Sequence, residues 1–540
     1  MRPMKARPFL AVLLALALAL LGLGAGGWWL LLHRGPLGLQ SRALALPLAA
    51  RFVPRTAPLS IHWLVGPDQP AAYARAVAPP RQRRAAAAAA DRLRDGAFAA
   101  AGLDYATELA PWLGGQSSFA LLTPPEQGGE PGWVLALRSR DSEGARRFLQ
   151  RFWQTRSLAG TGLQISSYRG MGLISGSGAL LGQEPQPLAT ALINDDLVLI
   201  ASGRGVLEQA LDVSQIDELN QAASLPLQQA VARLGNGVAL LTARPAAMEA
   251  WLGLPGLTNN AEAPLVELVA ALVPAGQGLR LDALAQLSTP VAPLSSSAAA
   301  EQLLQQLHLP STSLALLQNP AQLLAPPTDG AAAQSNPWRM LLGPLLAQAL
   351  ERETGPLPAL VAGADPGPLL WSTQSDGWLL GSRVDQPTPE LIEPALEASG
   401  FSGAPLLSKG QPLQAWTRLQ STPVRGNPDQ LQAQLAGARA VENDLAWWGQ
   451  GLAVLNRQQE GRQQPRERLA QLQDLATPKA PFQWAMDGPT ASALLSRWQP
   501  WRLLTSLSST PLAAPVQGAA LSLEADAPQA LRLRARLQLG

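Results

Sequence analysis

The sequence predicts an α+β protein with one N-terminal transmembrane helix followed by two similar modules of antiparallel sheet with packed helices. Three observations predict this class: an uncharged apolar run near the N-terminus, strand-like segments interrupted by amphipathic helical segments, and matching segments about 245 residues apart. The predicted parts are a cytoplasmic N-terminus at 1–8, a transmembrane anchor at 9–32, a membrane-proximal linker at 33–55, a first α+β module at 56–290, a linker at 291–307 and a second α+β module at 308–540.

The apolar run near the N-terminus has the length of a membrane span. Residues 9–32 contain no charged side chain and include Trp28 and Trp29 close to their end. At about 1.5 Å per residue, a helix of this length crosses a hydrocarbon core of about 30 Å. The alternative is a cleaved signal peptide, but its apolar core has only about 7–15 residues, and bulky tryptophans are poor neighbours for a cleavage site. We therefore expect a retained signal anchor.

The charges that flank this run predict its direction. Arg2, Lys5 and Arg7 precede it, whereas only Arg34 and Arg42 follow soon after it. Lysine and arginine are enriched on the cytoplasmic side of membrane spans. The expected topology is a single-pass membrane protein with a cytoplasmic N-terminus and a periplasmic or thylakoid-lumenal bulk.

Composition excludes several classes of function. The chain carries a formal net charge of +2 and has no cysteine and three histidines. A nucleic-acid partner is not expected, because such proteins concentrate basic residues on one face. Without cysteine there are no disulfides, no thiolate metal sites and no cysteine nucleophile. A histidine-based zinc site or catalytic triad would depend on His62 or His308 alone, since His33 lies at the membrane edge.

The first pair of matching segments predicts a strand that leads into a helix. Gly132-Trp133-Val134-Leu135 recurs 245 residues later as Gly377-Trp378-Leu379-Leu380. After the first copy, a helix is expected from Asp141, because apolar residues recur at helical spacing behind a capping residue. After the second copy, Thr388-Pro389 is expected to begin a helix that Pro394 kinks or shortens.

Three further pairs follow in the same order, at offsets of 244 to 252 residues. They are 194–200 with 443–448, 237–241 with 481–485, and 279–287 with 531–539. Ordered matches of this kind predict an internal duplication, with opening strands at 61–65 and 313–317. The closing strand 531–539 alternates leucine or alanine with arginine or glutamine, which predicts antiparallel pairing and one solvated face.

No motif with a catalytic mechanism is present. Gly176-Ser177-Gly178 lacks the third glycine of a dinucleotide-binding loop, and the glycines at 22–27 have no strand before them. Asp195-Asp196 is interpreted as a hairpin turn. Glu351 and Glu353 form a second acidic pair, but the cleft geometry of glycosidase carboxylates is not visible in sequence. We therefore expect no enzyme activity, no catalytic residue, no cofactor site and no metal site.

Two further features have a structural and a functional interpretation. Arg81, Arg83 and Arg84 precede an alanine-rich helical segment and would suit anionic lipid head groups or an acidic partner, although a solvated helix face is the commoner role. The chain has 16 tryptophans, most of them in apolar segments. Core packing explains such tryptophans, and a cavity for a hydrophobic ligand is the alternative.

One set of blocks resembles a known family. It comprises Asp104-Tyr105, Pro111-Trp112-Leu113-Gly114, the Gly132-Trp133 strand, Tyr168-Arg169-Gly170 and the hairpin at 194–200. These blocks resemble a mainly cyanobacterial family of membrane-anchored exported proteins of unknown function. The match covers most of the first module, whereas the second has no clear Pro-Trp-Leu-Gly copy. The resemblance implies an envelope or thylakoid-lumen location and no functional residues.

These observations lead to one expected function and two alternatives. We expect a membrane-anchored extracytoplasmic binding or scaffolding protein, held in the bilayer by residues 9–32 and contacting a partner protein. The first alternative is a carrier or binder of a hydrophobic ligand such as a lipid or pigment. An enzyme of unknown reaction is the second.

Overall fold

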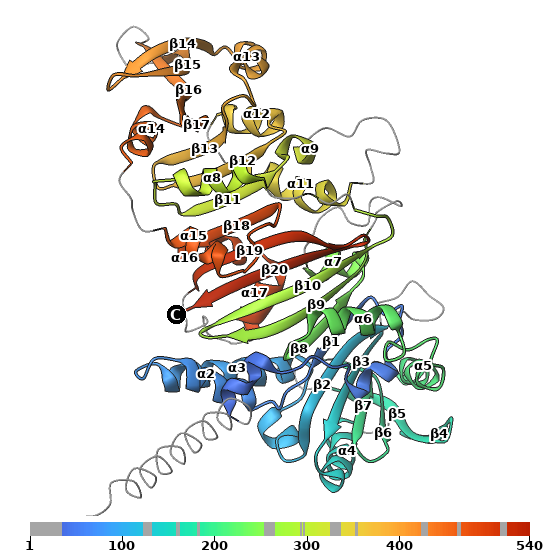
Figure 1. Ribbon diagram of the computed structural model, residues 1–540. Coiled ribbons are helices and arrows are strands. Elements are labelled where there is room, and N and C mark those ends of the chain that lie inside the picture. Colours follow the sequence, from blue (N-terminus) through green and yellow to red (C-terminus); the bar gives the residue numbers. More distant parts are fainter. Residues whose placement is uncertain are drawn as a thin grey trace, which may run out of the picture. The chain divides into compact units, whose positions relative to one another are not determined.

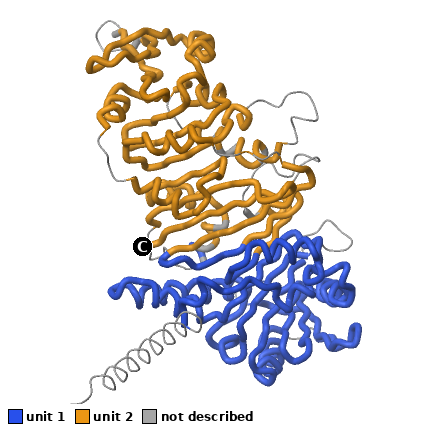
Figure 2. Tube along the Cα trace, viewed as in Figure 1, with its two compact units in different colours: residues 1–240, 271–277, 504–514 blue, residues 241–270, 278–503, 515–540 orange. Residues whose placement is uncertain are grey.

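The computed structural model is α+β and consists of two compact units (Figures 1 and 2). Unit 1 comprises residues 1–240, 271–277 and 504–514, and unit 2 comprises residues 241–270, 278–503 and 515–540. The structure describes residues 35–122, 132–157, 162–180, 184–252, 265–291, 294, 297–324, 336–350, 355–422, 430–461, 466–507 and 516–540.

Unit 1 contains an antiparallel sheet with the strand order β1-β2-β3-β7-β6-β5-β4. Each strand pairs with a neighbour in the antiparallel sense, so hairpins make most of its connections. The strands are β1 (Leu59–Trp63), β2 (Leu113–Leu122), β3 (Gly132–Ser139), β4 (Gln164–Tyr168), β5 (Met171–Ala179), β6 (Pro185–Ile193) and β7 (Leu197–Ala201).

Helices cover both faces of the unit 1 sheet. Val134 and Ala136 of β3 pack with α5 on one face, and Leu135 and Leu137 pack with α4 on the other. Because successive strand residues point to opposite faces, this explains why β3 is apolar without alternation. The helical elements are η1 (Pro36–Ser41), η2 (Leu48–Phe52), α2 (Gln69–Val77), α3 (Arg83–Ala100), η3 (Tyr105–Leu109), α4 (Ser142–Arg156), α5 (Arg204–Gln215) and α6 (Leu225–Leu234).

Unit 2 contains a longer antiparallel sheet with the order β10-β20-β19-β18-β11-β12-β13-β17-β16-β15-β14. The strands are β10 (Gly278–Leu287), β11 (Ser313–Gln318), β12 (Pro368–Gln374), β13 (Gly377–Arg383), β14 (Ser402–Ser408), β15 (Gln411–Thr422), β16 (Gln430–Glu442), β17 (Leu445–Gly449), β18 (Phe482–Asp487), β19 (Val516–Ala527) and β20 (Ala530–Leu539). Two more strands, β8 (Ala239–Ala243) and β9 (Leu265–Ala275), carry the chain from one unit to the other.

The main core of unit 2 lies between its sheet and helices α8, α14 and α15. Leu303, Leu455 and Leu472 from these helices meet strand residues such as Leu379 and Trp447. The helices of unit 2 are α7 (Pro245–Leu252), α8 (Ala298–Gln306), α9 (Pro320–Leu324), α11 (Pro337–Leu350), α12 (Leu357–Ala364), α13 (Pro389–Ala398), α14 (Leu452–Gln459), α15 (Glu467–Gln473) and α16 (Gly488–Leu495). Helix α17 (Gln499–Leu507) begins in unit 2 and ends in unit 1.

The two sheets repeat one pairing order. The order β1-β2-β3-β7-β6-β5-β4 corresponds strand for strand to β11-β12-β13-β17-β16-β15-β14. The hairpin turns repeat as well: Arg169-Gly170 and Lys409-Gly410 both have positive φ, and so do Asn194-Asp195 and Asn443-Asp444. Glycine, asparagine and aspartate tolerate this conformation, which two-residue hairpins require. The compact units are defined by contacts and do not coincide with the predicted modules 56–290 and 308–540. The predicted module boundaries stay a prediction.

Both segments predicted as linkers contain helical elements in the structure. The linker expected at 33–55 contains η1 and η2, where Leu39, Ala50 and Phe52 are buried. The linker expected at 291–307 contains α8, whose Ala300 and Leu303 are fully buried. The few large apolar side chains in both segments are sufficient to hold them against a core.

Two predicted elements differ in detail from the structure. Helix α13 continues past Pro394 to Ala398, so the proline does not end it. Strand β20 is antiparallel as expected, but its arginine face is only partly solvated, because acidic side chains from neighbouring elements contact Arg532, Arg534 and Arg536.

The predicted anchor at 9–32 lies outside the described residues. Among the residues that are described, no helix is both long enough and apolar enough to span a bilayer.

Candidate functional site

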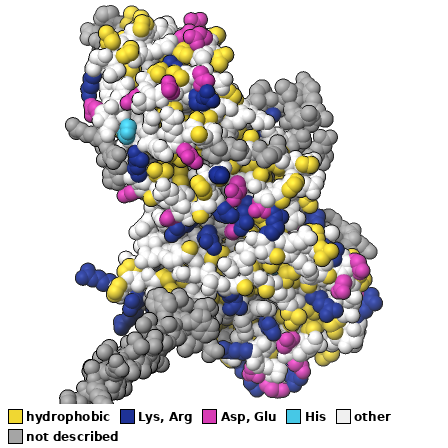
Figure 3. Space-filling model, viewed as in Figure 1, with side chains coloured by type: hydrophobic (Ala, Val, Ile, Leu, Met, Phe, Trp, Pro, Cys, Tyr) yellow, Lys and Arg dark blue, Asp and Glu magenta, His cyan; other side chains and the backbone are white. Residues whose placement is uncertain are grey.

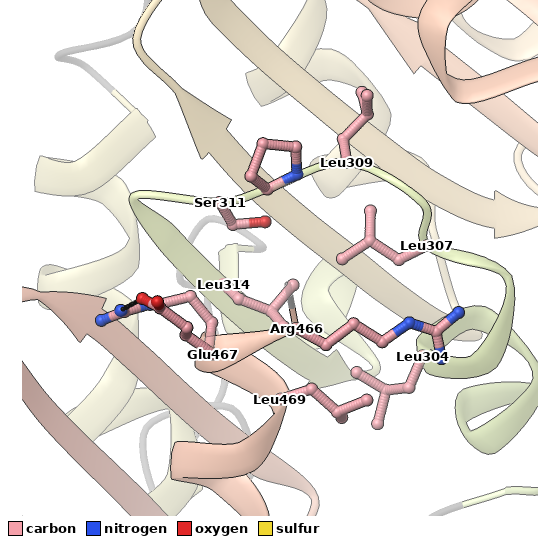
Figure 4. Close-up of a pocket in the computed structure, with 10 residues that line it drawn as sticks. Leu304, Leu307, Leu309, Ser311, Leu314, Arg466, Glu467 and Leu469 are labelled. Carbon is pink, nitrogen blue, oxygen red and sulfur yellow. Dashed lines mark hydrogen bonds and ion pairs between the residues drawn. The ribbon is translucent and has the colours of Figure 1, made fainter. Parts of the chain in front are cut away.

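A small pocket in unit 2 opens between α8, the loop that leads into β11, and the start of α15 (Figure 4). Its volume is about 190 Å³, and leucines supply most of the apolar wall. Arg466 crosses the pocket toward Leu304 in Figure 4. The lining residues are Leu304, Leu307, Leu309, Pro310, Ser311, Leu314, Arg466, Glu467, Arg468 and Leu469.

Hydrogen bonds fix both walls of this pocket. The backbone N–H of His308 donates to the Gln458 side chain at 3.1 Å, and the His308 ring bonds the Gln458 carbonyl oxygen at 3.0 Å. On the other side, Arg466 donates to the carbonyl oxygen of Gln305 at 2.9 Å, which ties the start of α15 to the end of α8. His308, one of the two histidines singled out from sequence, therefore holds a loop beside the pocket and does not enter it.

Two of the three charged side chains that line the pocket, Arg468 and Glu467, pair with each other. The buried Arg468 guanidinium contacts the Glu467 carboxylate at 2.8 Å and donates to Gln471 at 3.0 Å. The Ser311 hydroxyl lies 2.7 Å from that of Ser372, and no histidine or carboxylate of the described residues contacts either hydroxyl. The pocket is therefore suited to hold a small apolar group, and it lacks the nucleophile–base pair that acyl transfer requires.

His62 lies in a fully buried polar network in unit 1. Its Nδ1 is 2.9 Å from the Ser118 hydroxyl, and its Nε2 is 3.2 Å from the Ser60 hydroxyl and 3.4 Å from Gln221. Burial lowers the pKa of the ring to about 4, and the bond to Gln221 opposes this shift. Because His62 and both serines are buried, a substrate cannot reach the serine–histidine contacts. The network is therefore structural.

A buried carboxyl in unit 2 was not singled out from the sequence. Asp365 follows α12 and has no exposed surface; its Oδ1 accepts from the N–H of Gly367 at 2.8 Å, and its Oδ2 has no partner among the described residues. Burial raises its pKa to about 7. Only tertiary packing distinguishes this aspartate from the many exposed ones, so no sequence signal could have found it.

Other residues singled out from sequence occupy structural positions. Asp195 lies in the β6–β7 turn, as predicted, and pairs with Arg146 at 2.7 Å. Trp112, Trp378 and Trp447 are fully buried, which confirms core packing for them. Glu351, Glu353 and His33 lie outside the described residues. Within the described ranges no group of three His, Asp or Glu side chains could hold a metal ion.

The end strands β4 and β14 occupy equivalent places in the two sheets. In the described part of the chain, β4 pairs only with β5, and β14 pairs only with β15. Each carries a large apolar side chain in solvent: Ile165 is 80% exposed and Leu407 is 79% exposed. Since open strand edges and exposed apolar side chains both favour association, these strands are the second candidate site.

The fold defines the class of protein: it is α+β and contains two antiparallel sheets with the same strand-pairing order. Its candidate sites are a small apolar pocket and two open end strands. The chain belongs to a protein family of unknown function, DUF3352, whose profile matches residues 13–539. This membership confirms the expected family of unknown function, whereas its mainly cyanobacterial distribution and its diagnostic blocks stay predictions. No curated protein matches the chain.

Two solved structures show a distant likeness. Crystal form IV of TP0453 is 8% identical, with a TM-score of 0.26 over 45% of this chain and 81% of that one. Crystal form I of TP0453 is 10% identical, with a TM-score of 0.28 over 48% of this chain and 86% of that one. Likeness at this level carries no argument about function.

Proposed function

We propose that the chain is a single-pass membrane protein that binds or scaffolds a partner protein outside the cytoplasm. Residues 9–32 anchor it, residues 1–8 lie in the cytoplasm, and the bulk lies in the periplasm or the thylakoid lumen. The arrangement of flanking charges supports this direction. In this proposal the chain has no catalytic role and serves envelope or thylakoid assembly through protein contacts.

The repeated end strands carry this proposal. Ile165 on β4 and Leu407 on β14 occupy the outermost strand of their sheets and are almost equally exposed. A single exposed apolar side chain is common on protein surfaces, but the same feature at the same topological position of both sheets favours a shared role. Partner contacts through these strands would bury side chains that now face solvent.

The first alternative, a carrier of a hydrophobic ligand, has less support from the pocket described above. Pockets for drug-sized ligands have volumes of about 300–1,000 Å³. The pocket in unit 2 has about 190 Å³ and is suited to a short apolar group. We therefore rank a lipid or pigment carrier second.

The test compares three single variants of the full chain. Each is purified in mild detergent, and the proteins and lipids that accompany it are identified by mass spectrometry. Ile165→Asp and Leu407→Asp place a charge on the end strands, and Leu225→Asp places one at an exposed leucine on α6 as the control. A protein recovered with wild type and Leu225→Asp, but lost with either end-strand variant, supports the proposal.

Three other outcomes would contradict the proposal or favour the carrier. A protein lost equally with all three variants contradicts the role of the end strands. Recovery of stoichiometric lipid or pigment without a protein favours the carrier. Recovery of none of these counts against both functions.

A further inference from the structure

Helices α2 and α3 form a hairpin that projects from unit 1, and one end of this hairpin is strongly basic (Figures 1 and 3). Arg81, Arg83 and Arg84 lie at the turn between the two helices, and all three are exposed. Pro79 and Pro80, in the same turn, are exposed as well. Figure 3 shows dark blue side chains at the free end of this projection.

The charge of this turn is not neutralised within the described residues. None of the three arginines forms an ion pair there; Arg83 only donates to the carbonyl oxygen of Ala78, at 3.5 Å. Elsewhere in the same hairpin, Arg94 contacts three carboxylates, those of Asp68, Asp91 and Asp95. The hairpin therefore has one internally balanced region and one basic end that is available to an external anion.

The basic end does not serve the stability of α3. Arg83 and Arg84 occupy the first turn of an 18-residue helix that has no acidic residue in that turn. The positive end of the helix dipole disfavours cations at this position. Arg83 and Arg84 lie where the helix dipole disfavours them, and no carboxylate of the described residues compensates. This indicates that the two arginines have a role other than stabilising the fold.

The hairpin is also packed against η1 (Pro36–Ser41), which begins close in sequence to the predicted membrane anchor. Three residues, 33–35, separate Leu32 from η1, so η1 begins at most about 14 Å along the chain from the end of the anchor. Helix η1 packs on α2: Gln40 donates to the Tyr73 hydroxyl at 2.9 Å, and Leu39 lies in one buried cluster with Tyr73. With residues 9–32 in a bilayer, as proposed above, η1 fastens the chain to α2 a few residues beyond the span.

We propose that Arg81, Arg83 and Arg84 dock unit 1 on the surface of an anionic lipid bilayer, an inference that rests on the proposed anchoring of residues 9–32. Guanidinium groups bind phosphate oxygens strongly, and a basic residue near an anionic membrane surface strengthens binding roughly fivefold at low salt. The three arginines together give about a hundredfold preference for the docked orientation, which fixes how the tethered unit faces the membrane.

The test uses the full chain in lipid nanodiscs. Because the chain has no cysteine, Gln82→Cys places one fluorophore among the arginines. Quenching by nitroxide-labelled head groups is measured in discs of phosphatidylcholine and in discs that also contain phosphatidylglycerol. The variants are Arg81, Arg83 and Arg84 all to Gln, the same three to Lys, and, as a control with the same loss of charge, Arg146, Arg147 and Arg151 to Gln on α4.

We expect quenching that requires phosphatidylglycerol and disappears near 1 M salt, where the Debye length is about 3 Å. The Gln variant should lose docking about a hundredfold, whereas the Lys variant and the α4 control should retain it. Equal quenching in both lipids, or in wild type and the Gln variant, overturns the inference alone. Docking that arises only when an acidic protein is added overturns it in favour of that partner. A chain that fails to enter the discs overturns the anchoring and this inference with it.

Discussion

Arg532 and Asp282 form a two-point ion pair, with Nε–Oδ1 and Nη2–Oδ2 distances of 2.8 and 2.6 Å, although 250 residues separate them. The pair connects β20 to β10, the closing strands predicted for the two copies of the module. Asp526 also contacts Arg532, at 3.3 Å. Only 14% of the Arg532 side chain and 10% of the Asp282 side chain are exposed, so water screens this pair weakly.

Asp282→Asn should therefore destabilise unit 2. The substitution leaves a largely buried guanidinium with the more distant Asp526 carboxylate, at a cost of about 3 kcal/mol. The free energy of unfolding in urea measures this loss. Asp376→Asn is the matched control, because its pair with Arg457 is exposed and contributes about 0–1 kcal/mol. Equal losses of unfolding free energy in the two variants would contradict a larger contribution from the buried ion pair.

Strand pairing shows how much of this fold the sequence could predict. The alternation in β20 predicted an antiparallel strand, and the repeated Asn-Asp pairs predicted the turns before β7 and β17; both predictions are confirmed. These signals are local, since strand period and turn conformation depend on a few adjacent residues.

The candidate sites could not be predicted in the same way. The pocket brings residues 304–314 beside residues 466–469, and the apolar lining resembles any core segment in sequence. Likewise, nothing local distinguishes the exposed Leu407 from a buried leucine; only its place on an end strand does. Helix α8 was predicted as linker because burial of Ala300 and Leu303 depends on strands far away in the chain.

The stability of unit 1 should depend on the protonation of His62. Its pKa is about 4 in the folded chain, against an ordinary value of 6.5. Between these values the unfolded chain takes up a proton that the folded chain excludes, so stability falls as the pH drops from about 7 to 4, by about 3 kcal/mol. Unfolding of wild type and His62→Asn is compared across this range. The free energy of unfolding of His62→Asn should lack this decrease between pH 7 and 4. The same decrease in wild type and the variant would contradict a neutral buried His62 ring.

Asp365 should have the opposite pH dependence. Its pKa of about 7 in the folded chain exceeds the ordinary value of 3.8. Between these values the unfolded chain is ionised and the folded chain is protonated, so stability falls as the pH rises from about 4 to 7. Asp365→Asn should be more stable than wild type at pH 8, by up to about 4 kcal/mol, and should lose this advantage near pH 4. Urea unfolding at both pH values measures the difference, and a variant that is less stable at pH 8 would contradict the prediction.

Ser382 should stabilise unit 2 through its hydrogen bond with the buried Trp448. The Trp448 Nε1–H donates to the Ser382 hydroxyl at 3.0 Å, and both residues are buried. Ser382→Ala leaves the indole N–H without an acceptor and should cost about 1–3 kcal/mol. Thermal unfolding followed by tryptophan fluorescence measures the loss. Ser496→Ala, at an exposed position just after α16, is the control, and an equal change there would contradict the prediction.

The topology of the chain tests the proposed function most directly. Met4→Cys and Gln82→Cys are introduced separately into the cysteine-free chain, and a membrane-impermeant maleimide is added to sealed vesicles of either orientation. We expect position 4 to be labelled only from the cytoplasmic face and position 82 only from the opposite face. Labelling of both positions from one face, or in the reversed order, would contradict an anchored protein with its bulk outside the cytoplasm.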